Sequence, residues 1–351
     1  MVIRSRAPLR IGLAGGGTDL DSYSKEYGGA VINATVNMYA YCSIIPSGDG
    51  KIVIDAIDNH NRLETEARPV LELDGDNLIL HRGVYNRVVK DFNGGKPLSF
   101  RMSTSNDAPV GSGLGTSSAM VVAILEAFNC WLSLGLKKEE LAHLAFDIER
   151  NDLKLAGGKQ DQYSASYGGL NFMEFLKDGR TKVTKLDIKP SKIKELESSL
   201  LLFYSGKSRS SALVQLELAK NVIDSQISGA ENKKFNTIEA LGVIKQIALN
   251  MKDDLEKGSL EGFGECLRSG WEHKKKTSSH VSNTEIDSVI KFVSSHGAEA
   301  VKISGAGGGG FLLVYFNPVN RQKLIEHASL LDGKIYPVSF SFEGAESWTE
   351  E

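Results

Sequence analysis

The stretch at residues 109–119 limits how this chain can fold more than any other part of the sequence. It reads Pro-Val-Gly-Ser-Gly-Leu-Gly-Thr-Ser-Ser-Ala and leads directly into residues 115–133, where apolar side chains recur at helical spacing. Glycines let a backbone approach an anion closely, and the first amides of a helix have no partner within the helix. One Ser or Thr would be enough to cap such a helix, so the three hydroxyls at 116–118 favour a phosphate-binding loop over a plain cap.

A second glycine-rich stretch, residues 302–310, contains the spacing Gly-x-Gly-x-x-Gly. A dinucleotide site of the Rossmann type needs a helix directly after these glycines. Residues 311–316 read Phe-Leu-Leu-Val-Tyr-Phe instead, which is typical of a strand. The sequence therefore argues against a dinucleotide oxidoreductase. It leaves a glycine loop between two strands, which could form an anion site or line a substrate.

A third stretch, residues 7–20, reads as a strand that ends in three consecutive glycines at 15–17 and is followed by Thr18 and Asp19. Two interpretations of Asp19 stay open. Its carboxylate either binds a sugar hydroxyl or caps a helix that begins near residue 20.

Glu149 and Asp161 are the candidates for metal binding and acid–base chemistry. Glu149 lies near the end of the predicted helix 138–150, and Asp161 follows a glycine pair at 157–158. Phosphoryl transfer needs a metal ion to bridge phosphates, and it gains from a group that accepts the proton of the acceptor hydroxyl. The residues alone leave open that Glu149 is a solvated helix end and Asp161 a helix cap. The seven histidines lack the spacing of a zinc site.

The order of predicted elements indicates an α+β fold with two domains rather than a doubly wound parallel sheet. Strands are predicted within 30–57 and at 97–104, 200–204, 298–304, 311–316 and 334–342, with a hairpin over 169–187. Helices are predicted at 20–27, 115–133, 138–150, 161–166, 209–226, 233–256, 258–272, 284–296 and 318–328. A length of 351 residues suits two cores. The lysine-rich, proline-containing stretch 185–194 predicts domains of residues 1–188 and 189–351.

Composition limits the class of partner. The net charge of −3 does not supply the basic surface that nucleic-acid binding requires. No apolar segment approaches the roughly 20 residues that span a membrane, and the N-terminus lacks the pattern of a secretory signal. We therefore expect a cytoplasmic protein with no nucleic-acid or membrane partner.

The three glycine-rich stretches, together with Asp161-Gln162, resemble the galactokinase–homoserine kinase–mevalonate kinase–phosphomevalonate kinase (GHMP) family, and they occur in the order found there. The resemblance covers nearly the whole chain. It implies a two-domain α+β fold, with an N-terminal domain similar to domain 2 of ribosomal protein S5 and a ferredoxin-like C-terminal domain. The active site would lie between them, and the protein would be an ATP-dependent small-molecule kinase, a monomer or a homodimer.

The resemblance also implies roles for individual residues. The residues that would bind ATP are Pro109, Gly111, Ser112, Gly113, Leu114, Gly115, Thr116, Ser117 and Ser118. Ser117 and Glu149 would hold Mg²⁺, although counting the motif backwards from Ala119 puts Ser118 in place of Ser117. Asp161 would be the catalytic base, and Arg10 would keep it ionised. The residues that would bind the substrate are Gly16, Gly17, Thr18, Asp19, Gly305, Ala306, Gly307 and Gly308.

Within the family, the chain departs from galactokinases because glycines at 15–17 replace their Gly-Glu-His. Residues 9–20, 84–92, 157–162 and 168–175 resemble D-glycero-D-manno-heptose 7-phosphate kinases instead. This resemblance implies transfer of the ATP γ-phosphate to the anomeric hydroxyl of the heptose 7-phosphate, giving a 1,7-bisphosphate for surface glycan precursors. An L-fucose or other hexose 1-kinase is the first alternative, and a non-catalytic sugar-binding regulator the second. The substrate's own phosphate would need cations, for which Lys159, Lys207 and Arg209 are candidates.

Overall fold

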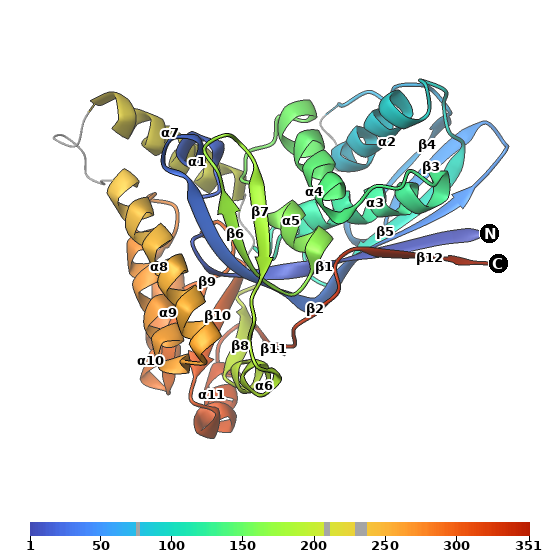
Figure 1. Ribbon diagram of the computed structural model, residues 1–351. Coiled ribbons are helices and arrows are strands. Elements are labelled where there is room, and N and C mark those ends of the chain that lie inside the picture. Colours follow the sequence, from blue (N-terminus) through green and yellow to red (C-terminus); the bar gives the residue numbers. More distant parts are fainter. Residues whose placement is uncertain (75–77, 207–210, 229–236) are drawn as a thin grey trace.

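The chain folds around two β-sheets, which Figure 1 shows in a computed structural model that describes residues 1–74, 78–206, 211–228 and 237–351. The larger sheet has eight strands in the described ranges, in the order β12 (Glu346–Glu350), β1 (Val2–Ala14), β2 (Gly29–Pro46), β5 (Phe100–Asn106), β3 (Lys51–Ala56) and β4 (Asn61–Glu66), with β6 (Leu170–Phe175) and β7 (Thr181–Lys185) continuing from β2. The smaller sheet has the order β11 (Lys334–Pro337), β8 (Leu200–Tyr204), β10 (Phe311–Phe316) and β9 (Ala298–Ile303). Most pairs are antiparallel, and β3 pairs with β5 in parallel. The α+β prediction is confirmed.

Helix α3 (Thr116–Leu132) is the centre of the first half. It packs on β1 and β2, and it is apolar almost all round, with every residue from Ala119 to Leu125 buried. Three further helices contact it: α2 (Ile79–Phe92), α4 (Lys138–Asp147) and α5 (Gln160–Tyr167). The π-helical turn η2 (Ile148–Asp152) follows α4 and packs against α2. Aromatic packing completes this core, since Phe128 lies edge-on to Phe100 with ring centres 5.6 Å apart.

The second half surrounds the smaller sheet with helices. They are α6 (Pro190–Ser198), α8 (Thr237–Lys257), α9 (Leu260–Lys274), α10 (Thr284–Ser295) and α11 (Arg321–Ala328). Helix α8 also packs against β1 and β2, and one hydrophobic cluster contains both Met251 and Ile11, so the two halves share apolar packing. Helix α7 (Ser211–Ser228) contacts the short helix α1 (Asp21–Tyr27) of the first half.

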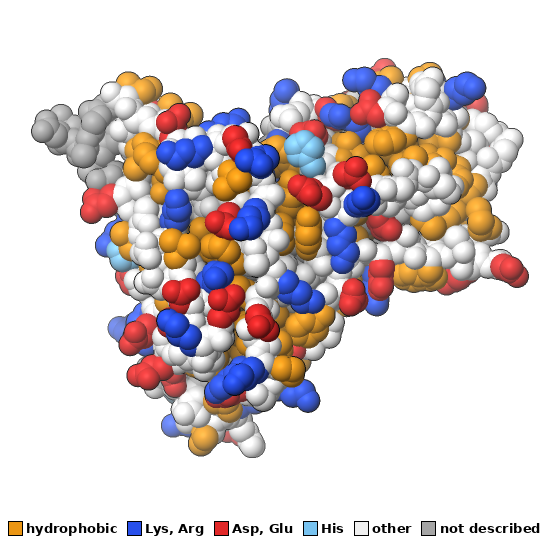
Figure 2. Space-filling view, in the orientation of Figure 1, with side chains coloured by type: hydrophobic (Ala, Val, Ile, Leu, Met, Phe, Trp, Pro, Cys, Tyr) orange, Lys and Arg blue, Asp and Glu red, His pale blue; other side chains and the backbone are white. Residues whose placement is uncertain are grey.

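The surface is mixed in charge on the face drawn in Figure 2. Basic and acidic side chains alternate there over the helices of the second half rather than gathering by sign. Within the described ranges, no helix combines the length and the apolar character that a membrane crossing requires.

The C-terminal strand β12 was not predicted. It pairs with β1 in antiparallel register, Arg6 opposite Glu346 and Val2 opposite Glu350, so both chain ends lie in the larger sheet (Figure 1). Its sequence, Glu-Ser-Trp-Thr-Glu, lacks buried apolar alternation because it is an exposed edge strand. The boundary at 188/189 stays a prediction, but the last strand belongs to the first sheet. Helix α2, helix α6 and strand β4 were also missed.

The first and second glycine-rich stretches touch each other through their backbones. The Phe311 amide donates to the Ser112 carbonyl at 2.9 Å, and a Cβ built on Gly305 would lie 2.6 Å from the Gly113 carbonyl oxygen. Gly305 has a φ of +76°, so a side chain there meets both a strained backbone and a neighbouring chain. This contact joins the two halves of the molecule next to the start of α3.

We expect Gly305→Ala to lower the free energy of unfolding by about 3 kcal/mol, because the new methyl group forces the two loops apart. Gly135→Ala is the matched control. Gly135 has nearly the same φ, +72°, but nothing lies within 4 Å of its added Cβ. The control should therefore lose only the backbone penalty of about 1 kcal/mol. Urea unfolding of both variants measures the difference, and equal losses would contradict a tight contact between the loops.

Candidate active site

The start of α3 lies uncapped at the first glycine-rich stretch. The N-cap residue is Gly115, in a left-handed conformation with φ of +75°, and no side chain accepts a hydrogen bond from the first turn. The Ser and Thr hydroxyls at 116–118 therefore do not serve as the helix cap. Free amides at the N-terminus of a 17-residue helix favour an anion.

A hollow lies in front of this helix start, and we call it the Glu149 hollow. Its lining includes Gly111, Gly113, Gly115, Thr116, Ser117, Ser118, Glu149 and Asp161. The other members of the predicted ATP set lie elsewhere. Ser112 and Leu114 are fully buried beneath the loop, and Pro109 is exposed outside the hollow.

Glu149 is buried rather than solvated. Helix α4 gives way to η2 at this point, and the wider turn carries Glu149 inward to 2% exposure. Burial raises the pKa of its carboxyl, while Arg150 and hydrogen bonds from Gln162 and Ser118 act in the opposite direction. Gln162 donates to Glu149 and also, at 3.1 Å, to the Ser118 hydroxyl.

The same arrangement bears on where a magnesium ion could bind. The Gln162 amide donates to both Glu149 and the Ser118 hydroxyl, which brings Ser118 close to the carboxylate. Ser117 lines the same hollow. Among the described residues, no group of three or more His, Cys, Asp or Glu side chains could hold a metal by itself. Mg²⁺ fits this donor set all the same, since it is commonly held by one or two carboxylates together with substrate phosphates and water.

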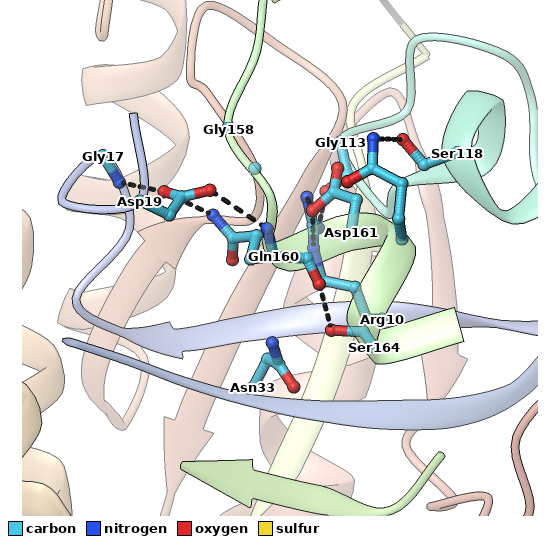
Figure 3. A network of polar contacts seen from close by, with 12 residues as sticks. Arg10, Gly17, Asp19, Asn33, Gly113, Ser118, Gly158, Gln160, Asp161 and Ser164 are labelled. Atoms are coloured by element: carbon cyan, nitrogen blue, oxygen red, sulfur yellow. Dashed lines mark hydrogen bonds and ion pairs between the residues drawn. The ribbon is translucent and has the colours of Figure 1, made fainter. Parts of the chain in front are cut away.

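Asp161 is held by Arg10, as Figure 3 shows. The Arg10 side chain donates to Asp161 Oδ1 from Nε at 2.8 Å, and its Nη2 lies 2.7 Å from the same oxygen. Its Nη1 donates to the Gly113 carbonyl at 2.6 Å. Both contacts with Asp161 involve Oδ1, so Arg10 leaves Oδ2 without a bond from the guanidinium. Asp161 is not a helix cap, because α5 begins at Gln160 with Lys159 at the N-cap.

Asp19 lies in the wall of a second hollow. Its carboxylate accepts hydrogen bonds from the Gly17 amide at 3.1 Å and from the amide and side chain of Gln160 at 3.2 Å each (Figure 3). Burial raises the pKa of Asp19, and the nearby charge of Asp161 adds to the effect. Gly158 packs so closely that an added Cβ would lie 1.9 Å from Asp19 Oδ2. Asp19 therefore does not cap α1, whose N-cap is Leu20.

We call this second cavity the Asp19 hollow. Five of the residues predicted to bind the substrate line it: Gly16, Gly17, Asp19, Gly305 and Ala306. Three other predicted substrate residues do not. Thr18 is fully buried, and its hydroxyl bonds the backbone of Gly15 and Ala30. Gly307 and Gly308 pack instead against Val281.

The two hollows adjoin each other. Six residues line both of them: Arg10, Arg150, Asp161, Gln215, Gly305 and Ala306. Asp161 therefore faces the helix start on one side and the Asp19 hollow on the other. A carboxylate in that position can receive a proton from a group in one hollow while that group reacts with an anion in the other.

Sequence reasoning missed several residues of this site. Gln160 donates to Asp19 and Gln162 donates to Glu149, and these two glutamines flank Asp161 in the sequence. Arg150 directly follows Glu149, so adjacency in the sequence was a usable signal for all three. Lys274, which also lines the Asp19 hollow, comes from α9 and had no local signal. The candidate Lys159 lines neither hollow, since its amine bonds Asp21 and the Gly179 carbonyl at 3.0 Å each. Lys207 and Arg209 lie outside the described residues.

Comparisons with known proteins give the family of the chain. The family model of the GHMP kinases N terminal domain matches residues 77–169, and that of the GHMP kinases C terminal domain matches residues 251–329. The D-glycero-alpha-D-manno-heptose 7-phosphate kinase of Campylobacter jejuni is 40% identical over 99% of this chain and 98% of its own length. An L-fucokinase/L-fucose-1-P guanylyltransferase of Bacteroides fragilis is 25% identical over 89% of this chain but only 34% of its own length.

Solved structures give the same result. A D-glycero-D-manno-heptose 1-phosphate kinase from Bacteroides thetaiotaomicron superposes with a TM-score of 0.83 at 40% identity, covering 99% of each chain. Galactokinase of Lactococcus lactis superposes with a TM-score of 0.78 at 15% identity over 98% of this chain and 95% of its own, which supports the fold alone. The chain therefore belongs to the GHMP kinase family, and it is an ATP-dependent kinase with the two-domain fold of that family.

Proposed function

We propose that the protein is a sugar kinase that transfers the γ-phosphate of ATP to the anomeric hydroxyl of D-glycero-D-manno-heptose 7-phosphate, giving the 1,7-bisphosphate. The observation that carries the proposal is the position of Asp161, which lines both adjoining hollows. The choice of sugar is supported by 40% identity across the whole chain to a protein named for that substrate. The weaker match to a fucokinase makes L-fucose the alternative acceptor.

The Glu149 hollow would take the triphosphate. The uncapped first turn of α3 offers backbone amides to phosphate oxygens, and the glycines at 111, 113 and 115 allow close approach. Mg²⁺, held by Glu149 and a hydroxyl at 117 or 118, would supply neutralisation of phosphate charge. Arg10 and Arg150 line the same hollow and add fixed positive charge where the phosphates would lie.

The Asp19 hollow would take the sugar. Asp19 keeps lone pairs beyond those used by Gly17 and Gln160, so it can accept from a sugar hydroxyl. The acceptor oxygen would lie between Asp161 and the γ-phosphorus. As its bond to phosphorus forms, its proton passes to Asp161, the bond from the γ-phosphorus to the bridging oxygen breaks, and ADP leaves. Arg10 fixes the orientation of Asp161 throughout.

A panel of acceptors tests the proposal. The purified protein is given ATP and Mg²⁺ with heptose 7-phosphate, the unphosphorylated heptose, L-fucose or D-galactose, and ADP release is measured together with phosphorus NMR of the product. We expect the highest kcat/KM with heptose 7-phosphate and a new phosphate on the anomeric carbon. Preference for L-fucose would overturn the choice of sugar, and no transfer to any sugar would overturn the assignment as a sugar kinase.

Asp161→Asn should fold and bind ATP but lose at least about 100-fold in kcat, the usual scale for loss of a general base. The amide keeps the shape of the side chain and cannot take the acceptor proton. Asp178→Asn is the control, since Asp178 is an exposed turn residue that lines neither hollow. Near-normal turnover of Asp161→Asn would remove Asp161 from the role of base.

Glu149→Gln should lose magnesium affinity without losing stability. Burial makes the pKa of the Glu149 carboxyl higher in the folded state than in the unfolded state, so its ionisation destabilises the fold as pH rises above the unfolded-state pKa. A neutral amide at this position removes that cost near pH 7. We expect Tm without ligand to be unchanged or higher, and the rise in Tm on adding Mg²⁺ and ADP to be smaller than in the unmodified protein. A full Mg²⁺-dependent rise would contradict the site.

Ser118→Ala and Ser117→Ala decide which hydroxyl takes part. Because Ser118 shares Gln162 with Glu149, we expect Ser118→Ala to raise the Mg²⁺ concentration needed for half-maximal turnover about tenfold, a typical effect for a group that supports a metal. Ser117→Ala should have the smaller effect. The reverse order would assign the ligand to Ser117.

A further inference from the structure

Lys274 presents an ammonium group to the Asp19 hollow. It is the last residue of α9, and its Nζ donates to the carbonyl of Gly305, a residue that lines both hollows. An ammonium has three N–H donors. Among the described residues, the Gly305 carbonyl is the acceptor that Lys274 uses, so further donors remain for a ligand in the hollow.

Two other positive charges of this region, Arg10 and Lys302, donate mainly to protein groups. Arg10 bonds Asp161 and the Gly113 carbonyl. Lys302, on β9, donates to the carbonyls of Gly12 and Leu13 at 2.8 and 3.0 Å. Lys274, by contrast, forms no ion pair with Asp19 or Asp161 within the described part of the chain, although the charge of each carboxylate acts on it. Its charge is therefore available to an anion.

We propose that the Lys274 ammonium binds the phosphoryl group in transit between ATP and the acceptor oxygen. This inference rests on the proposed function. In the step, the acceptor oxygen bonds to the γ-phosphorus, its proton passes to Asp161, and the bond to the bridging oxygen of ADP breaks. Lys274 keeps its protons and donates to the non-bridging oxygens, so the second half of the chain adds a cation to the donors of the first half.

A phosphate already carried by the sugar is a second possible source of the same chemistry. Lys274 lies in the field of Arg10 and Asp161, the residues at the junction of the two hollows. The 7-phosphate of a heptose is separated from the anomeric oxygen by several bonds along the sugar. The Lys274 ammonium bonds the carbonyl of Gly305, which lines both hollows together with Asp161, and this places it at the junction where the transferred group would pass.

The protonation state of Lys274 adds a measurable signature. Desolvation, together with the charge of Arg10, lowers its pKa to about 8, while Asp19 and Asp161 act against the shift. The charged groups that face it come from β1 (Arg10), the following turn (Asp19), α5 (Asp161), β9 (Lys302) and η2 (Arg150). The ammonium is present below that pKa and is lost as pH rises through it, so kcat/KM should fall above about pH 8.

The test compares Lys274→Met, Lys274→Arg and the control Lys275→Met, whose lysine pairs with Glu272 at 2.9 Å and lines neither hollow. The acceptors are heptose 7-phosphate and whichever unphosphorylated sugar the unmodified protein uses. We expect Lys274→Met to lose about 100-fold in kcat with both acceptors, with little change in the KM of either. Lys274→Arg should recover part of kcat and lose the fall above pH 8, because arginine stays charged.

Each contrary outcome has a distinct meaning. A raised KM for heptose 7-phosphate alone would assign Lys274 to the substrate's own phosphate and overturn the proposal. Unchanged kcat in Lys274→Met would overturn it while leaving the proposed function intact. An unmodified protein that phosphorylates no sugar would overturn both. If Lys274→Met does not fold, Lys274→Arg decides, since a fall above pH 8 that persists in this variant would exclude Lys274 as its source.

Discussion

The pairing of Arg10 with Asp161 is the contact on which the rest of the site depends. Arg10 is nearly fully buried on β1, and a buried guanidinium needs partners for its donors. It finds them on α5 and on the glycine loop before α3, while its own amide donates to the Leu114 carbonyl at 2.9 Å. One planar side chain thus fixes a strand, a loop and a helix relative to each other. A lysine carries its three donors on one compact, rotatable ammonium, so it lacks the planar fork that gives this geometry.

Other buried charges gather around this pair at a cost to stability. Glu149 and Asp19 both have raised pKa values because they are buried, and Lys302 has a pKa well below the ordinary lysine value for the same reason. Charges held out of water in fixed positions need little reorganisation when a ligand brings opposite charge. The shared apolar packing between α8 and the strands β1 and β2 stabilises the fold that keeps them there.

The sequence was informative where the site is built from contiguous residues. The loop and helix start at 109–119, and the two carboxylates near it, could be identified because each chemical group follows its neighbours in the chain. Whether Glu149 was solvated or buried could not be decided from the sequence, since the turn η2 that carries it inward depends on packing against α2 and α4. The strand β12 could not be predicted either. Its pairing with β1 joins residues more than 300 positions apart, and such contacts leave no local pattern.

The two hollows also differ in how far apart in the sequence their lining residues lie, and this difference bears on substrate choice. The wall of the Glu149 hollow comes mainly from two neighbouring regions of the first half, residues 111–118 and 149–161. The Asp19 hollow is assembled from the turn at 16–20, from α5, and from α7, α9 and the loop at 305–306 in the second half. Under the proposed function, the phosphate-binding wall can stay fixed while the second half changes the shape and charge offered to the sugar. The residues proposed to select the substrate are therefore the least visible in the sequence, because many of them meet only when the two halves pack together.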